Sequence, residues 1–257
     1  MLSLRLVLCL LAVAHAPLSL GLDRERLRIG TEAAYPPFAY VDEQGEMQGF
    51  DIDITKALCD VLEVECTLIN QNFDGLIPAL RARKFDAVVA SMSITEERKK
   101  SVDFTDKYYK TPAKFVAAEG ADLTISPEGL ADKTVGVQRA TTHDRYLSDQ
   151  FPDTEIRRYG TQEEAFLDLQ AGRIDAILAD SVAIQDGFLG TESGEGFAFI
   201  GPNLVDPQWF GEGAGIAVRP GDDELRQALN QAIVTLRENG TYDEIQKKYF
   251  DFDIYGQ

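Results

Sequence analysis

One pattern, a helix end followed by a basic turn and an apolar strand, occurs twice in this chain. Residues 80–90 read LRARKFDAVVA and residues 169–179 read LQAGRIDAILA. In both, the residues after the Asp-Ala pair are apolar, as in a strand that is buried on both faces. Helix–turn–strand units share chemistry, so a chance match is the alternative. We favour the interpretation that the chain builds two similar lobes.

Short strand patterns alternate with helical ones on both sides of this repeat, which predicts an α/β fold. The expected strands cover residues 27–30, 65–69, 85–90, 134–137, 155–159 and 174–179. The expected helices cover residues 51–62, 73–83, 142–151, 162–170, 222–237 and 241–249, with a Gly-rich crossing over 209–218. A C-cap is expected at residues 238–240, where Gly240 can supply a positive φ.

Two polar residues follow the repeated apolar strands. Ser91 comes directly after the first strand and Asp180 directly after the second. Ligands of open α/β sheets bind outside the carboxyl ends of the strands. If the lobes face each other, Ser91 and Asp180 look into one crevice. Asp180 suits an ammonium group there, although capping the next turn is an equally common role for Asp.

Further candidate ligand-binding residues lie beside expected strand and helix ends. Arg98 can form a two-pronged contact with a carboxylate, near a helix start that Thr95 would cap; a surface ion pair is the alternative. Thr141 and Thr142 open a helix and can hold an anion or act only as a cap. The remaining candidates are Tyr35 and Phe73, as aromatic partners of a cation or as core residues, and Glu32, facing a cationic tip.

The first residues have the layout of a signal peptide. Arg5 precedes an apolar run over residues 6–13, and the small-residue pattern Ala14-His15-Ala16 follows. We therefore expect residues 1–22 to be a leader of an exported, periplasmic protein. The pair that remains, Cys59 and Cys66, is expected to form a disulfide in an oxidising compartment, with two buried thiols as the alternative.

The charge of the chain narrows the classes of partner. With 43 acidic and 25 basic side chains, the net charge is −18, which disfavours nucleic acid and anionic lipid. Without the leader, His143 is the one histidine left, so a histidine-rich metal site or a histidine-based triad is hard to assemble. We expect no metal and no cofactor, and a monomeric protein.

Several longer motifs follow one another along nearly the whole chain after the leader. They are TEAAYPPF (31–38), GFDID (49–53), NFDGLIP (72–78), SMSITEER (91–98), SVDFT (101–105), GFL (187–189), NGTYD (239–243) and KKYFDF (247–252). In this order they resemble the periplasmic lysine/arginine/ornithine- and histidine-binding proteins of ABC importers, bacterial extracellular solute-binding protein family 3. Within that group the chain is most similar to the arginine/ornithine-binding branch.

The resemblance implies a type II periplasmic binding protein fold, in which each lobe is a mixed sheet flanked by helices and two strands form the hinge. Lobe 1 would comprise residues 23–110 and 208–257, and lobe 2 residues 111–207. Cys59 and Cys66 fall where lysine/arginine/ornithine-binding relatives carry a disulfide. The implied function is capture of a basic amino acid by lobe closure, for delivery to a membrane permease.

The resemblance also implies a role for each candidate residue. Arg98, Thr141 and the Thr142 amide would hold the ligand α-carboxylate. Asp180, Ser91 and Ser93 would hold the α-ammonium, and Tyr35 and Phe73 would stack on the side chain. The chain departs from the family pattern at four positions. Near the cationic tip, Glu32 replaces an Asp, which shortens the pocket by one methylene and bears on the choice between ornithine and arginine, and Ala90 replaces a Ser. Gln138 and His143 stand where relatives have other side chains, and they would also contact the ligand.

Two other functions compete with capture. An exported cyclohexadienyl dehydratase can share the two-lobed fold, because fold does not settle function. Such an enzyme needs a cleft for a prephenate-like dianion, whereas Glu32 and Asp180 would make this cleft acidic opposite Arg98. A ligand-gated receptor domain would need membrane segments. We therefore expect a binding protein and not an enzyme.

Overall fold

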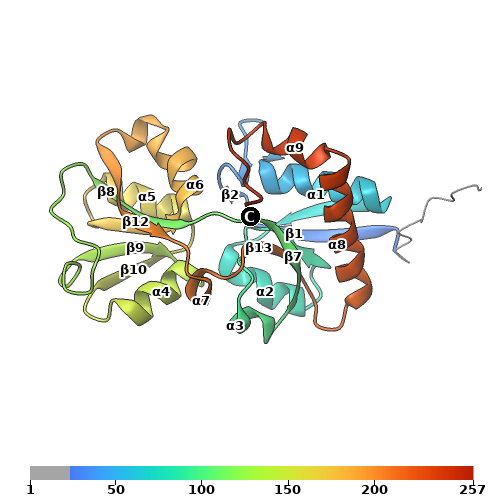
Figure 1. The fold of residues 1–257 in the computed structure, drawn as a ribbon, viewed down its shortest axis with the longest axis horizontal. Coiled ribbons are helices and arrows are strands. Elements are labelled where there is room, and N and C mark those ends of the chain that lie inside the picture. The colour runs from blue at the N-terminus through green and yellow to red at the C-terminus, as the bar shows by residue number, and fades with distance from the viewer. Residues whose placement is uncertain (1–23, 257) are drawn as a thin grey trace, which may run out of the picture.

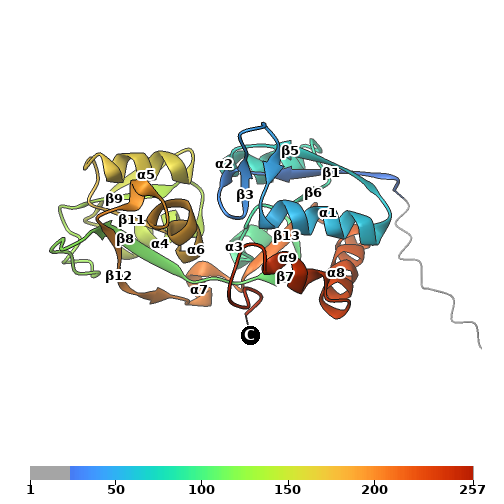
Figure 2. The same ribbon diagram turned by 90° about the horizontal axis from the view of Figure 1, so that it is seen from above.

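The computed structural model describes residues 24–256, so the expected leader, residues 1–22, lies outside the described residues. Two lobes lie side by side, and each is built on its own five-stranded sheet (Figure 1). Seen from above, the lobes remain separate bodies, with α7 (Pro207–Phe210) between them (Figure 2). The expectation of an α/β protein with two lobes is confirmed.

The sheet of the first lobe takes strands from both ends of the chain. Strand β1 pairs in parallel with β5 and β6, and the returning strand β13 pairs antiparallel with β6 and β7. The order is β5 (Glu65–Asn70), β1 (Arg26–Thr31), β6 (Ala87–Val88), β13 (Ala214–Val218) and β7 (Asp103–Tyr109). Of the strand expected over residues 85–90, only Ala87 and Val88 form β6, although the amides of Asp86 and Val89 also donate to carbonyls of β1; Ser91, just beyond, has a φ of 51°.

The sheet of the second lobe repeats this plan. Strand β9 pairs in parallel with β10 and β11, while β8 pairs antiparallel with β11 and β12. The order is β10 (Glu155–Tyr159), β9 (Thr134–Gln138), β11 (Ala176–Asp180), β8 (Ala113–Ala118) and β12 (Phe197–Leu204). Each sheet is therefore mixed, as expected, although the sequence patterns did not reveal β7, β8 or β12.

Helices cover both faces of each sheet and enclose a separate apolar core on each face. In the first lobe, Leu58 and Leu229 belong to one core and Leu76 to the other. In the second lobe, Leu147 and Phe166 belong to opposite cores. The helices of the first lobe are α1 (Phe50–Leu62), α2 (Phe73–Arg81), α3 (Glu96–Lys99), α8 (Asp223–Glu238) and α9 (Thr241–Gln246). Those of the second are α4 (Thr142–Gln150), α5 (Gln162–Gln170), α6 (Ser181–Ile184) and the turns η1 (Gln185–Leu189) and η2 (Glu192–Gly194).

Local signals set several helix ends. Thr161 and Glu164 form a reciprocal capping box at the start of α5, so that two amides of the first turn are satisfied. Helix α8 ends at Glu238 with Asn239 as its C-cap residue, and Gly240 follows with a φ of 84°, so the expected C-cap is confirmed. A small sheet of β2 (Ala34–Tyr35), β3 (Ala39–Val41) and β4 (Met47–Gln48) completes the first lobe.

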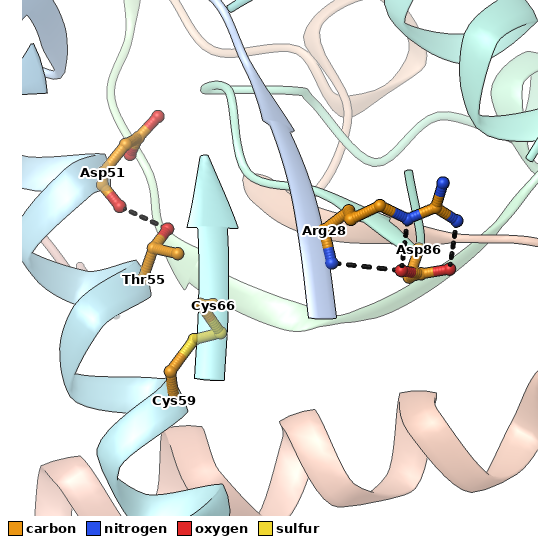
Figure 3. The surroundings of a disulfide bond; sticks show 6 residues. All are labelled: Arg28, Asp51, Thr55, Cys59, Cys66 and Asp86. Atoms are coloured by element: carbon orange, nitrogen blue, oxygen red, sulfur yellow. Dashed lines mark hydrogen bonds and ion pairs between the residues drawn. A yellow bond between two sulfur atoms is a disulfide. The ribbon is translucent and has the colours of Figure 1, made fainter. Parts of the chain in front are cut away.

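A disulfide joins Cys59 of α1 to Cys66 of β5 (Figure 3). The expected pairing is confirmed, and the alternative of two free thiols is wrong. The bridge closes a short loop, with a sequence separation of 7 residues. The chain-entropy model gives such a loop about 2.5 kcal/mol of stabilisation. The bridge therefore fastens α1 to the edge strand of the first sheet.

The chain crosses between the lobes twice, after β7 and after β12 (Figure 1). The first crossing covers residues 110–112 and the second covers residues 205–213, which include α7. The Gly-rich crossing expected over residues 209–218 is thus resolved into the end of α7, a short loop and strand β13. Two crossings of this kind match the two-strand hinge that we expected.

Candidate ligand-binding site

Two adjoining cavities of about 50 and 30 Å³ are lined by residues of both lobes. Ser91 and Asp180 both line the larger cavity, so the expectation that they share one crevice is confirmed. Every residue that we predicted to bind ligand lines one cavity or both: Glu32, Tyr35, Phe73, Ser91, Ser93, Arg98, Thr141, Thr142, His143 and Asp180.

Arg98 lines the smaller cavity without a carboxylate partner. Its Nη1 donates to the Ser93 carbonyl at 2.9 Å and its Nη2 to the Ala140 carbonyl of the other lobe at 3.2 Å. No carboxylate in residues 24–256 forms an ion pair with it, so the alternative of a surface Arg–Glu pair is wrong. Burial lowers the pKa of Arg98 to about 10, which leaves the guanidinium charged at neutral pH.

The two helix starts beside Arg98 differ in what they can offer an anion. Helix α3 is a single turn of 4 residues, and Thr95 caps it as expected, because its hydroxyl accepts from the Arg98 amide at 3.2 Å. At α4 the Thr141 hydroxyl accepts from the Asp144 amide at 3.1 Å and donates to the Gln138 carbonyl at 2.7 Å. The hydroxyl of Thr141 is therefore occupied by the cap, and the first amides of α4 are the groups that remain for an anion.

Asp180 combines the two roles that its sequence position left open. Its Oδ1 accepts from the amides of Val182 at 2.8 Å and Ala183 at 3.4 Å, which caps α6. Its Oδ2 accepts from the Thr111 hydroxyl on the first crossing. Burial raises the pKa of Asp180 to about 6, and no cation in the described part of the chain pairs with it. The carboxylate thus caps a helix and still faces the larger cavity.

Glu32 lies just beyond β1 and is 4% exposed. Its Oε1 accepts from Gln138 Nε2 at 2.7 Å and from the Phe73 amide at 3.3 Å. Burial raises the pKa of Glu32 to about 7, and these hydrogen bonds offset part of that rise. A cation beside Glu32 would favour the ionised form of this carboxyl group and so lower its pKa.

Two rings and an imidazole complete the lining. Tyr35 lines both cavities and stacks on Phe38, with ring centroids 5.9 Å apart. Phe73 lies against Arg98, 5.3 Å from ring centroid to guanidinium carbon. Burial and the neighbouring Arg98 lower the pKa of His143 to about 3, so this side chain lines the cavities as a neutral imidazole.

Sequence reasoning missed Asp51 as a supporting residue. This fully buried carboxylate accepts from the Ser91 amide at 2.8 Å, the Ser91 hydroxyl at 3.0 Å and the Tyr108 hydroxyl at 2.8 Å. A non-glycine residue with a positive φ costs about 1 kcal/mol or more, so these bonds hold Ser91 in its bent conformation. The GFDID motif contains Asp51, but its contact with Ser91 is visible only in three dimensions.

Residues 24–256 contain no group of three or more His, Cys, Asp or Glu side chains arranged to hold a metal ion. No helix in the same range is both long and apolar enough to cross a membrane. The site consists of fixed charges, hydroxyls and rings from two lobes.

Two lobes with charged cavities between them, lined from both sides, are the arrangement of a two-lobed solute-binding protein. Comparison with known families agrees, since the model of bacterial extracellular solute-binding proteins, family 3, matches residues 27–252. The chain belongs to this family.

Individual relatives match over most of their length. The chain is 55% identical to the L-arginine-binding protein of Pseudomonas aeruginosa over 90% of both proteins. It is 42% identical to the histidine-binding periplasmic protein of Escherichia coli, over 99% of this chain and 98% of the relative. A solved periplasmic binding protein of Salmonella typhimurium, described as highly specific for arginine, is 37% identical with a TM-score of 0.82, over 88% of this chain and 99% of the other. These relatives are binding proteins, so the comparisons do not favour the dehydratase alternative.

Proposed function

We propose that this protein captures a basic amino acid, arginine or ornithine first and lysine or histidine second, for an ABC importer. The observation that carries the proposal is the placement of three charged groups around the adjoining cavities. Arg98 lacks a carboxylate partner, and Asp180 and Glu32 lack a cationic one within the described residues. A basic amino acid has the complementary pattern of one negative and two positive groups.

Each ligand group has a chemical partner in this arrangement. The α-carboxylate would lie against Arg98 and the first amides of α4, the α-ammonium against Asp180 with Ser91 and Ser93, and the side-chain cation against Glu32. Tyr35 and Phe73 offer ring faces to the carbon chain or to a planar cation, worth about 0.5–2 kcal/mol. Lys110, on the first crossing, also lines the larger cavity. This second cation does not change the roles proposed for Arg98, Asp180 and Glu32.

Lobe closure would complete the site, because contacts between the lobes surround it. Arg145 of α4 pairs with Glu97 at 2.5 Å, and Arg139 lies 3.7 Å from Asp74. The two crossings would act as the hinge, with residues 23–110 and 208–257 in one lobe and 111–207 in the other. The closed protein would then be recognised by a membrane permease.

The leader pattern in residues 1–22 and the disulfide support export to the periplasm. The relatives named above include periplasmic proteins, which supports the same location for this chain. We further propose that it acts as a monomer, since one chain supplies both sides of the cavities.

A thermal-shift panel of the twenty amino acids plus ornithine tests the proposed function. A ligand at about 1,000 times its Kd adds about 4 kcal/mol to the free energy of unfolding. For a chain of this size that raises Tm by roughly 8–16 °C. We expect this shift for arginine or ornithine and smaller ones for neutral amino acids. Stabilisation by glutamate or glutamine alone would contradict the proposal.

The affinity for arginine should rise with pH. In the free protein the pKa of Glu32 is about 7 and that of Asp180 about 6. A bound cation favours both carboxylates, so the complex holds fewer protons than the free protein, and acid weakens binding. For one proton on Glu32 the loss is about 100-fold between pH 8 and pH 5.

Calorimetry in buffers of different ionisation enthalpy measures both the affinity and the protons released. We expect proton release near pH 6.5, roughly the middle of these two pKa values, and a weaker pH dependence in Glu32→Gln. An affinity that stays constant from about pH 5 to about pH 8 would show that neither carboxylate faces the ligand cation.

A further inference from the structure

Gln138 forms a direct bond between the lobes inside the site. It is the last residue of β9 in the second lobe and is 3% exposed. Its Nε2 donates to Glu32 Oε1 of the first lobe at 2.7 Å and to the Gly160 carbonyl at 3.2 Å. Both acceptors are oxygens without protons to give when Glu32 is ionised, so the amide nitrogen of Gln138 must be the atom that faces them.

This orientation leaves two free acceptor atoms. Glu32 Oε1 already takes two hydrogen bonds, from Gln138 and from the Phe73 amide, whereas Glu32 Oε2 and Gln138 Oε1 have no donor within residues 24–256. Neither oxygen is fully buried and without a hydrogen-bond partner. Among residues 24–256, only Thr31 Oγ1 and Gln162 Nε2 are side-chain atoms of that kind. Glu32 and Gln138 both line the smaller cavity, so these oxygens are the acceptors that the two side chains can offer to a ligand there.

We propose that Gln138 determines specificity: its amide oxygen and Glu32 Oε2 together form a two-acceptor cradle, one atom from each lobe, that selects a guanidinium over an ammonium. The proposal rests on the function proposed above and adds which basic side chain the site prefers. Arginine is the expected ligand, ahead of ornithine and lysine.

The chemistry of the two cations explains the choice. A guanidinium is planar and carries parallel N–H groups on two terminal nitrogens, so it can donate to two neighbouring acceptors at once. An ammonium is a compact point charge that draws most of its gain from the carboxylate alone. Because Gln138 occupies Glu32 Oε1, the carboxylate cannot offer both of its oxygens, and the second acceptor has to come from Gln138.

The bond between Gln138 and Glu32 also makes this cradle depend on closure. The two residues are 106 positions apart in the sequence and belong to different lobes. Their free oxygens are brought together only when the lobes meet. A guanidinium therefore finds its full set of acceptors only in the closed protein, whereas an ammonium can reach Glu32 before closure is complete.

Titration calorimetry with arginine, ornithine and lysine tests the proposal on the wild-type protein and Gln138→Met. The thioether cannot replace the amide oxygen, and its length is similar. We expect the wild type to prefer arginine, and Gln138→Met to lose about tenfold in arginine affinity but less than threefold for ornithine and lysine. The ratio of affinities is the readout, because a general defect in folding or closure weakens all three ligands alike.

Gln162→Met is the matched control. Gln162 is also a buried glutamine of the second lobe, 2% exposed, and it lines neither of the two cavities. It should leave the arginine-to-ornithine ratio unchanged. If Gln138→Met fails to fold, the wild-type series still decides: citrulline, whose neutral urea matches arginine in shape, and ornithine should both bind more weakly than arginine.

The outcomes separate the two proposals. A wild type that prefers ornithine, or a ratio that Gln138→Met leaves within twofold, would overturn the role of Gln138 while basic amino acids still bind. A wild type that binds no basic amino acid would overturn the proposed function, and the role of Gln138 with it.

Discussion

Arg98→Ala is expected to lower the affinity for every amino acid by about 1,000-fold. Among residues 24–256, Arg98 supplies the one cation that lines the smaller cavity, and the carbonyls of Ser93 and Ala140 hold its guanidinium in place. Without it, the ligand carboxylate would be buried opposite neutral amides and hydroxyls. Removing one partner of a buried ion pair costs about 3–5 kcal/mol, and 4 kcal/mol corresponds to roughly 1,000-fold in Kd. Calorimetry with arginine measures the loss.

Two further variants make the result specific. Arg98→Lys keeps the charge but loses the planar fork, so we expect an affinity between those of the wild type and Arg98→Ala. Arg145→Ala is the matched control, since Arg145 pairs with Glu97 across the lobes near the same helix start, with 45% of its side chain exposed. An exposed pair contributes about 0–1 kcal/mol, so the loss should stay below about fivefold. Near-native affinity in Arg98→Ala would remove Arg98 from the site.

Much of the site could be predicted from where strands end. Glu32, Ser91 and Asp180 each follow or end a strand whose carboxyl end points toward the other lobe, as the rule for open α/β sheets requires. The internal repeat placed Ser91 and Asp180 in corresponding positions without any knowledge of the packing. For these residues a local pattern was enough, because their placement depends on one strand each.

The supporting contacts could not be predicted in the same way. Asp51 reaches Ser91 over 40 residues, and Gln138 reaches Glu32 over 106. The strand-end rule would have included Gln138 among the candidates, because it ends β9. The rule would not have identified Glu32 as its hydrogen-bond partner. Such pairs depend on how helix α1 packs on the first sheet and on how the lobes meet. Periodicity describes one element at a time and contains neither piece of information.

The edge strands of the fold were hidden for a related reason. Strand β7 contains charged residues at Asp103, Asp106 and Lys107, and its pairing with β13 shifts register twice. Strand β12 pairs with β8 over a bulge between Ile200 and Leu204. An edge strand needs no continuous apolar run, because one side of it faces no other strand. These strands became visible only through the partners with which they pair.

Asp180→Asn is expected to reduce the affinity for all α-amino acids by about 100-fold or more. Asparagine keeps an oxygen that can accept from the Val182 amide, so the cap of α6 survives and the fold should be retained. What disappears is the negative charge opposite the ligand ammonium, which would then be buried without a counter-ion. Asp186→Asn, a change of the same kind at an exposed position just beyond α6, should leave the affinity within about twofold.

The comparison of Asp180→Asn with Glu32→Gln separates the two carboxylates of the site. If Asp180 holds the α-ammonium, its loss affects basic and neutral ligands alike, because every amino acid carries that group. If Glu32 holds the side-chain cation, its loss weakens arginine and ornithine but leaves the weak binding of neutral amino acids unchanged. Calorimetry with arginine and glutamine on both variants distinguishes these patterns. An Asp180→Asn protein that loses only basic ligands would place the side-chain cation at Asp180, and the ligand would then lie in the opposite direction along the two cavities.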